Sequence, residues 1–288
     1  MTAINAPSLF VDAVAPHVGP SGWDSTLTRI VYGEPAGAPR TQVLNYGGGT
    51  QTTGMIALCI EGRLPWPDHI VMADTGREAT ATWDWLHNVI APVLAQHGRT
   101  VEIAPHSLAT VDLFSTKGDV LMPMFTTQSG QMGQLHTYCS VEWKTRVVQR
   151  YLTQTHGVRR VDNWIGYSSD EASRMGKRGG WAEKWRAVYP LLDLNLDRED
   201  IQALVTRHFG RRAPKSSCWM CPHRGDAQWR ELRDHYPQDF AAAVQVDEEM
   251  RARDPHVYLH RSGKPLKDAP LTGQAADIAC SADGGCWT

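Results

Sequence analysis

Three consecutive glycines that lead from a strand into a helix constrain this chain more than any other feature. Residues 42–46 form a short apolar strand pattern, Gly47, Gly48 and Gly49 follow it, and a helix is predicted from about 52 to 59. In such a unit, bare backbone N–H groups and the helix N-terminus face the carboxyl edge of a sheet, where they attract anions. The same residues also suit a tight turn that binds nothing, and the turn alone leaves both interpretations open.

Strands and helices alternate after this turn, and the alternation predicts the fold class. Strand patterns at 69–73, 100–103 and 163–166 are separated by helical patterns at 80–96 and 141–154. Short strands that alternate with helices build a parallel sheet with both faces covered. We therefore expect a doubly wound, mostly parallel α/β sheet with a helical, cysteine-bearing region on its C-terminal side.

Changes in composition divide the chain into four expected segments. Residues 1–40 are rich in proline and glycine and form an extension, and residues 41–195 form the α/β domain, to which we assign the anion site. Residues 196–253 are helical and contain a C-x-x-C pair, whereas residues 254–288 are rich in glycine, proline and aspartate and lack periodicity. This last segment is expected to be a tail or an irregular cap.

The overall composition excludes several classes of protein. The chain has 288 residues, of which 42% are hydrophobic and 21% charged, and its net charge is −2. These values are ordinary for a globular protein and show no bias toward a polyanion or a membrane surface. The chain begins without a signal-peptide pattern and contains no apolar run that could span a bilayer. We therefore expect a cytoplasmic protein without a membrane partner.

The six cysteines are spaced for metal or redox chemistry. Cys218 and Cys221 form a C-x-x-C turn in which two sulfurs can converge on one metal, and Cys139 stands alone before a predicted helix. In a cytosolic protein this spacing favours a metal site over structural disulfides, while Cys59 lies in an apolar helical run and belongs to the core. Zinc in a Cys₃His or Cys₄ site is one interpretation, with further ligands from His136, His223, Cys280 or Cys286.

Several segments resemble, in order, the PP-loop superfamily of ATP pyrophosphatases and PAPS reductases, whose members are adenine nucleotide α-hydrolase-like proteins. The segments are 45–53, which resembles the PP-loop itself, 73–78, 165–174, 189–192 and 214–222. Together they cover roughly residues 42 to 250, and their combination resembles the PAPS-reductase-like branch of phages and bacteria. The resemblance implies a HUP-like fold that binds ATP, or the sulfonucleotides PAPS or APS, with Mg²⁺.

The resemblance also implies which residues bind the nucleotide. From the loop they are Tyr46, Gly47, Gly48, Gly49, Thr50, Gln51, Thr52 and Thr53, and from the later segments Asp74, Thr75, Gly76, Gly166, Asp170, Glu171 and Arg174. Asp74, at a strand end, and Lys144, a cation that could neutralise phosphate, are candidate catalytic groups. Asp74 could equally cap its own turn, and Glu171 and Arg174 could form only a local ion pair.

The loop departs from the family pattern at three positions. Asn45 stands where the motif has serine, Gln51 where it has aspartate or asparagine, and Thr52 where it has serine. A neutral Gln51 brings no charge to a Mg²⁺ ion. The sequence therefore supports phosphate binding better than metal-assisted cleavage of the bound nucleotide.

Three functions follow from these features. In the first, an ATP-dependent sulfurtransferase, an acceptor oxygen attacks the α-phosphate, pyrophosphate leaves, and sulfur then displaces AMP. The resemblance implies a [4Fe-4S] cluster on Cys139, Cys218 and Cys221, with Cys280 or Cys286 as a further ligand. The acceptor would be a nucleobase, a nucleic acid or a small molecule, and the sulfur donor a cysteine desulfurase or sulfide.

The second function is a PAPS or APS reductase with Cys286 as the nucleophile, although the chain lacks the Glu-Cys-Gly-Ile-His context of those enzymes. The third is a nucleotide-binding protein with structural zinc and no turnover. The missing context favours sulfur transfer over reduction. A homodimer is compatible with all three functions.

Overall fold

The computed structural model describes residues 26–28, 39–175 and 184–273. Most of the predicted N-terminal extension lies outside these residues, and so do Cys280 and Cys286. Within the described ranges, no helix combines the length and the apolar character that crossing a membrane requires.

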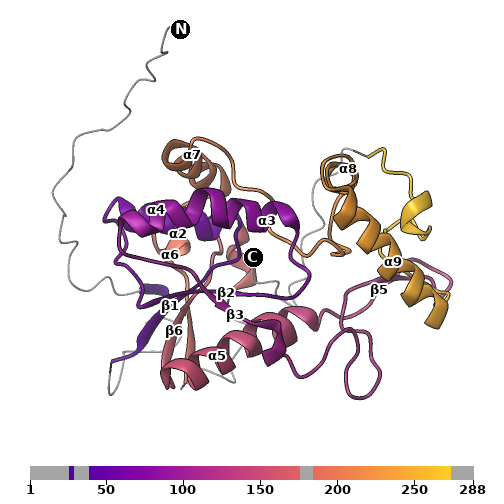
Figure 1. The fold of residues 1–288 in the computed structure, drawn as a ribbon, viewed down its shortest axis with the longest axis horizontal. Coiled ribbons are helices and arrows are strands. Elements are labelled where there is room, and N and C mark those ends of the chain that lie inside the picture. The colour runs from indigo at the N-terminus through magenta and orange to yellow at the C-terminus, as the bar shows by residue number, and fades with distance from the viewer. Residues whose placement is uncertain (1–25, 29–38, 176–183, 274–288) are drawn as a thin grey trace, which may run out of the picture.

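A five-stranded parallel sheet forms the centre of the fold (Figure 1). Its strands are β1 (Thr41–Asn45), β2 (His69–Ala73), β3 (Glu102–Ala104), β6 (Val161–Trp164) and β7 (Trp185–Val188). They lie in the order β3-β2-β1-β6-β7, so the chain leaves β1 toward one edge and later returns to its other side. Open α/β sheets bind ligands beyond the carboxyl ends of their strands, at the point where this order reverses. That point lies between β1 and β6.

Helices cover both faces of the sheet (Figure 1). On one face lie α2 (Thr50–Ile60), α4 (Ala91–Gln96), α6 (Pro190–Asp193) and α7 (Arg198–Phe209), and on the other α5 (Arg146–His156). Alternate residues of a strand point to opposite faces. Accordingly, Leu44 and Ile70 belong to the core under α2, whereas Val43 and Val71 belong to the core under α5. The predicted doubly wound α/β fold class is confirmed.

The two long helical patterns each contain a wider π-helical turn. The first runs through α3 (Thr80–Trp85), η1 (Leu86–Ile90) and α4, and its π turn directly precedes Pro92 at the start of α4. Proline has no N–H to donate, and a local change of helix type accommodates that loss. The second runs from η3 (Ser140–Thr145) into α5, which ends at Gly157 in the left-handed conformation.

A second hydrophobic core lies beside the first and joins distant parts of the chain (Figure 1). It combines the insertion after β3, with β4 (Phe125–Thr126) and β5 (Gly133–Gln134), and the C-terminal elements α8 (Asp226–His235), α9 (Pro237–Arg253), β8 (Val257–Tyr258) and η5 (Leu266–Asp268). Strand β4 pairs with both β5 and β8. The remaining short elements are η2 (His106–Leu108) and η4 (Ser169–Arg174).

These two cores divide the chain differently from the segments expected from composition. Helix α7 was grouped with the C-x-x-C region, but Ile201 and Val205 are buried in the first core together with residues of α2. Residues from 254 onward were expected to form a tail or an irregular cap, and Leu259 and Leu266 are buried in the second core, as in an irregular cap. Together with Val257 and Leu271 they follow no single helix or strand period, so a search for periodicity misses them.

A buried carboxylate ties β1, β6 and β7 together. Asp162, only 7% exposed, accepts hydrogen bonds from Arg40 at 2.7 Å, Arg186 at 2.8 Å and Gln42 at 3.1 Å. Burial raises the pKa of Asp162, but the hydrogen bonds from Arg186 and Gln42 and the charges of both arginines outweigh it, so the pKa lies below its ordinary value.

We expect Asp162→Asn to destabilise the fold by about 3–5 kcal/mol, because it leaves two partly buried guanidinium groups without their shared charge partner. The folded pKa of Asp162 is lowered, so its stabilisation is complete above the unfolded value of about 3.9 and is lost as the pH falls through the folded value. Urea unfolding at neutral and acid pH measures both effects. Asp84→Asn, at an exposed site on α3, is the control. An equal loss in the two variants would contradict the prediction.

Candidate nucleotide and cysteine site

The glycine turn lies at the carboxyl end of β1, next to the point where strand order reverses. Gly48 has φ of +77°, a conformation that favours glycine, and Gly49 precedes the first turn of α2. The first backbone bond of α2 runs from the Thr53 N–H to the Gly49 carbonyl, at 3.0 Å. Within the described residues, the N–H groups of Gly48, Gly49, Thr50 and Gln51 donate to no acceptor. Free donors at a helix N-terminus are able to bind an anion.

Packing also requires glycine at two positions of this turn. A Cβ atom on Gly48 would lie 2.6 Å from Thr82 Cγ2, and one on Gly49 would lie 2.6 Å from Ser216 Oγ. Thr82 belongs to α3, and Ser216 precedes the C-x-x-C turn. The glycines are therefore needed for the close approach of two other segments, whether or not an anion binds.

Unpartnered polar atoms around the turn distinguish a ligand site from a tight turn. Four buried side-chain atoms near it have no hydrogen-bond partner among the described residues: Asn45 Oδ1, Glu78 Oε2, Thr82 Oγ1 and Ser217 Oγ. Leaving such an atom unpaired costs about 1–3 kcal/mol, and native proteins rarely gather several in one place. Their concentration around the free amides fits a polar ligand such as a phosphate chain with its cation.

The turn after β2 directs Glu78, rather than Asp74, into the site. Asp74 Oδ1 accepts the Gly76 N–H at 2.7 Å, which is the local capping role that the sequence left open. Glu78 is 5% exposed, and its Oε1 lies 3.2 Å from the Lys144 ammonium. Glu78 and Lys144 line one pocket with Asn45 and other residues at the ends of β1 and β2. The structure thus places Lys144 beside the loop, as the sequence suggested, and adds Glu78.

The segment after β6 packs directly against the loop. A Cβ on Gly166 would lie 3.1 Å from Gln51 Cβ, and Gln51 Nε2 donates to Glu171 Oε2 at 3.1 Å. Glu171 also forms an ion pair with Arg174. The neutral Gln51 therefore holds a carboxylate next to the loop. Asp170 does not take part, because it is exposed and lines a groove with the first turn of α7.

Cys139, Cys218 and Cys221 line a single pocket, although they come from distant parts of the chain. Lys144 lines it too, and most of the remaining lining is apolar, including Met122, Trp143 and Met220. The pocket therefore adjoins the one at the ends of β1 and β2 and shares Lys144 with it. Cys59 is buried in the first core, as expected from its apolar surroundings.

Backbone pairing places the C-x-x-C turn against the turn that follows β2. The Ala79 N–H donates to the Ser217 carbonyl at 3.3 Å, and the Trp219 N–H donates to the Arg77 carbonyl at 2.9 Å. Arg224, itself 6% exposed, donates to the carbonyls of Ser217 and Cys218 and fixes this turn.

The chemistry and spacing of the thiols test which metal group would fit. Tetrahedral zinc, with Zn–S bonds of about 2.3 Å, brings its thiolates to about 3.8 Å from one another. Within the described residues, the three sulfurs do not form a set whose members all lie within 4.8 Å of one another. A [4Fe-4S] cluster binds each thiolate through a different iron and accepts a wider spacing. The pocket therefore fits a cluster better than zinc.

The surroundings of Cys218 keep its thiol protonated in the absence of a metal. Burial, and next the negative charge of Glu78, raise the pKa of Cys218 to about 12. Its sulfur lies 3.4 Å from Thr75 Oγ1 and 3.9 Å from Glu78 Oε1. Coordination to a metal would remove this proton. Cys280 and Cys286, expected as further ligands, lie outside the described residues, and the pocket lining includes neither His136 nor His223.

The structure is that of a doubly wound α/β protein with a glycine turn beside a three-cysteine pocket. No protein-family model and no curated protein matches the chain. Among solved structures, it is similar to the U34-tRNA thiolase NcsA from Methanococcus maripaludis with its [4Fe-4S] cluster. The identity is 14% and the TM-score 0.37, and the match covers 77% of this chain and 76% of that chain. This likeness is too distant to carry a conclusion about function.

We expect Gly49→Ala to weaken ATP binding by about tenfold or more, because the added methyl group displaces Ser216 and disturbs charge-assisted bonds from the loop amides. Titration with a fluorescent ATP analogue measures the effect. Gly133→Ala is the control, since its Cβ would meet Thr126 Cγ2 at an ordinary 3.7 Å. Unchanged affinity in Gly49→Ala would show that the turn serves packing alone.

Proposed function

We propose that this chain is an ATP-dependent sulfur-transfer enzyme, which adenylates an acceptor with release of pyrophosphate and then inserts sulfur. One observation carries the proposal: the pocket beside the glycine turn and the three-cysteine pocket adjoin each other and share Lys144. Glu78 connects them further, since it lies 3.2 Å from Lys144 and 3.9 Å from Cys218. This proximity suits a reaction in which a nucleotide activates an atom that sulfur then replaces.

The residues around the turn have separate roles in this proposal. The free amides of Gly48, Gly49, Thr50 and Gln51 bind phosphate oxygens, and Lys144 offsets the charge that develops as pyrophosphate leaves. Glu78 Oε2 has no hydrogen-bond partner and would bind the Mg²⁺ ion. Gln51 is neutral and cannot offset the charge of this ion.

The bond changes in this reaction balance without an external oxidant. The acceptor oxygen forms a bond to the α-phosphorus while the bond to pyrophosphate breaks. A sulfide-level nucleophile then forms the carbon–sulfur bond, and AMP leaves with the acceptor oxygen. Cys139, Cys218 and Cys221 would hold a [4Fe-4S] cluster, which supplies an open iron that keeps sulfide beside the activated carbon.

The chemistry of this reaction limits which acceptors and sulfur donors the enzyme can use. The acceptor needs a carbonyl-type oxygen that can be adenylated, such as that of a nucleobase, free or within a nucleic acid, or of a small molecule. The sulfur would come from sulfide or from a cysteine desulfurase. Free thiols and a cluster belong in a reducing compartment, and we therefore propose a cytoplasmic location.

Protein purified without oxygen is expected to contain about four iron and four sulfide per chain. Cys139→Ser should lose most of both, because it removes one of the three thiols in the pocket. Cys59→Ala, in the first core, should retain them. Iron and sulfide analysis decides the outcome, and a colourless wild-type protein with stoichiometric zinc that Cys139→Ser loses would favour the structural-zinc alternative.

Glu78→Gln is expected to remove most of the gain in ATP affinity that Mg²⁺ provides, while binding without Mg²⁺ changes little. The reason is that the carboxylate supplies charge to the cation and not to the phosphates. ATP titrations with and without Mg²⁺ measure the difference. Glu142→Gln on η3 is the matched control, since Glu142 pairs with Arg146 instead. A full Mg²⁺ effect in Glu78→Gln would exclude the assigned role.

A further inference from the structure

A second group of metal-ligating side chains lies at the opposite edge of the sheet from the glycine turn. His69 is the first residue of β2, Glu102 the first residue of β3, and His156 the last residue of α5. Because β2 and β3 are parallel, their first residues meet at the amino edge of the sheet. The proposed sulfur-transfer site uses none of the three residues.

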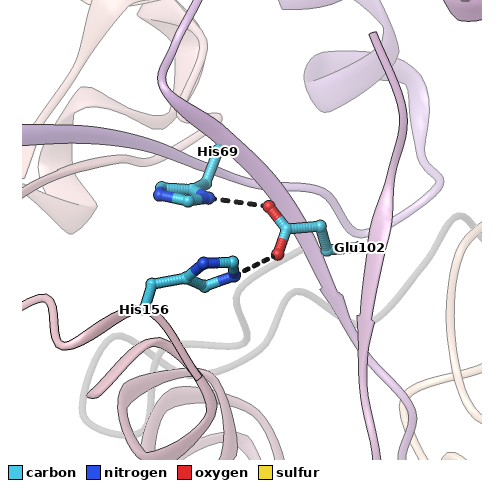
Figure 2. Close-up of side chains that lie close together, drawn as sticks. All are labelled: His69, Glu102 and His156. Carbon is cyan, nitrogen blue, oxygen red and sulfur yellow. Dashed lines mark hydrogen bonds and ion pairs between the residues drawn. The ribbon is translucent and has the colours of Figure 1, made fainter. Parts of the chain in front are cut away.

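The three side chains converge on one point (Figure 2). His69 Nδ1 lies 2.7 Å from Glu102 Oε1, and His156 Nε2 lies 2.6 Å from Glu102 Oε2. Both imidazole rings point toward the carboxylate, with their centroids 4.4 Å apart. In the described part of the chain, no other three histidine, cysteine or acidic residues have ligand atoms that all lie within 4.8 Å of one another.

We propose that His69, Glu102 and His156 bind a divalent transition-metal cation, for which Zn²⁺ is the best match. Zinc binds imidazole nitrogen and carboxylate oxygen at about 2.0–2.2 Å, which separates neighbouring ligand atoms by about 3.4 Å. The present separations of 2.6 and 2.7 Å need only a small opening of the cluster. Two imidazoles disfavour Mg²⁺ and Ca²⁺, which prefer oxygen ligands throughout.

The surroundings of the cluster suit a cation. The Tyr151 hydroxyl donates to Glu102 Oε2 at 3.0 Å and so orients the ligating carboxylate, as partners of metal ligands commonly do. His156 is exposed, so water can reach the cluster and fill a fourth position. Two neutral imidazoles and one carboxylate leave a Zn²⁺ complex with a single positive charge.

A cation at this point would join three elements that the chain connects only through long segments. It would link the first residues of β2 and β3 to the end of α5, the helix that continues directly from η3 and Lys144. Zinc would therefore stabilise the native fold by binding it in preference to the unfolded chain. The alternative is a carboxylate that only accepts hydrogen bonds from two histidines, and such a cluster would have no affinity for zinc.

Zinc titration of the full chain, with a chromophoric chelator as competitor, tests the proposal. Wild-type protein should bind one zinc more than His156→Gln does, and zinc should raise the melting temperature of the wild type more than that of His156→Gln. Tyr151→Phe should bind this zinc about tenfold to 100-fold more weakly. The control is His235→Gln, an exposed position at the end of α8, which should behave as wild type. Circular dichroism verifies that each variant is folded.

Co²⁺ in place of Zn²⁺ separates this site from the cysteine pocket, because thiolate ligands add intense near-ultraviolet absorption that imidazole and carboxylate ligands lack. The proposal expects the ion lost in His156→Gln to be free of that absorption and to persist in Cys139→Ser. Equal metal binding by wild type and His156→Gln would overturn it. Thiolate absorption from every bound Co²⁺ ion would also overturn the proposal. Both variants leave the glycine turn intact, so the outcome is independent of the sulfur-transfer proposal.

Discussion

The short antiparallel pairing between residues 77–79 and 217–219 determines how the candidate site is assembled. Its two backbone hydrogen bonds, at 2.9 and 3.3 Å, connect the turn after β2 to the C-x-x-C segment of the second core. This pairing brings Cys218 beside Glu78 and carries Ser216 over the glycine turn. The hydrogen bonds from Thr80 to Asp239 connect the same two parts of the structure.

The Glu78–Lys144 ion pair lies between the two halves of the site and is itself largely removed from water. A buried pair of this kind gains little net stability, because desolvation of both charges offsets their attraction. The ligands of the proposed site would each attract one member of this ion pair, because phosphate attracts Lys144 and a cation attracts Glu78. Nucleotide with its cation would therefore exchange one ion pair for two interactions with the ligand. The unpartnered Oε2 of Glu78 is consistent with a site that completes its bonding only then.

The sequence predicts the first core well because its signals are local. A strand, three glycines and a helix specify the turn at 47–49, and repeated strand and helix patterns specify the parallel sheet. The second core is predicted only in part, since its helices α8 and α9 lie in the region expected to be helical, whereas its irregular segments carry no local signal. The buried residues between 254 and 271 pack against α9 and the insertion after β3, and neither irregular segment has a period that reveals its buried side. Long-range packing, and not intrinsic propensity, orders this half of the molecule.

The site shows the same limit at the level of single side chains. Asp74 and Glu78 occupy one turn after β2, and the sequence gives no reason to prefer the second. The choice depends on a hydrogen bond from Gly76 that occupies Asp74 and on the pairing that buries Glu78 beside Lys144. His69 and Glu102 likewise stand at separate strand starts, where neither forms a motif. Parallel strands bring such ends together regardless of their distance in sequence, so both edges of this sheet gather polar side chains whose proximity only the topology reveals.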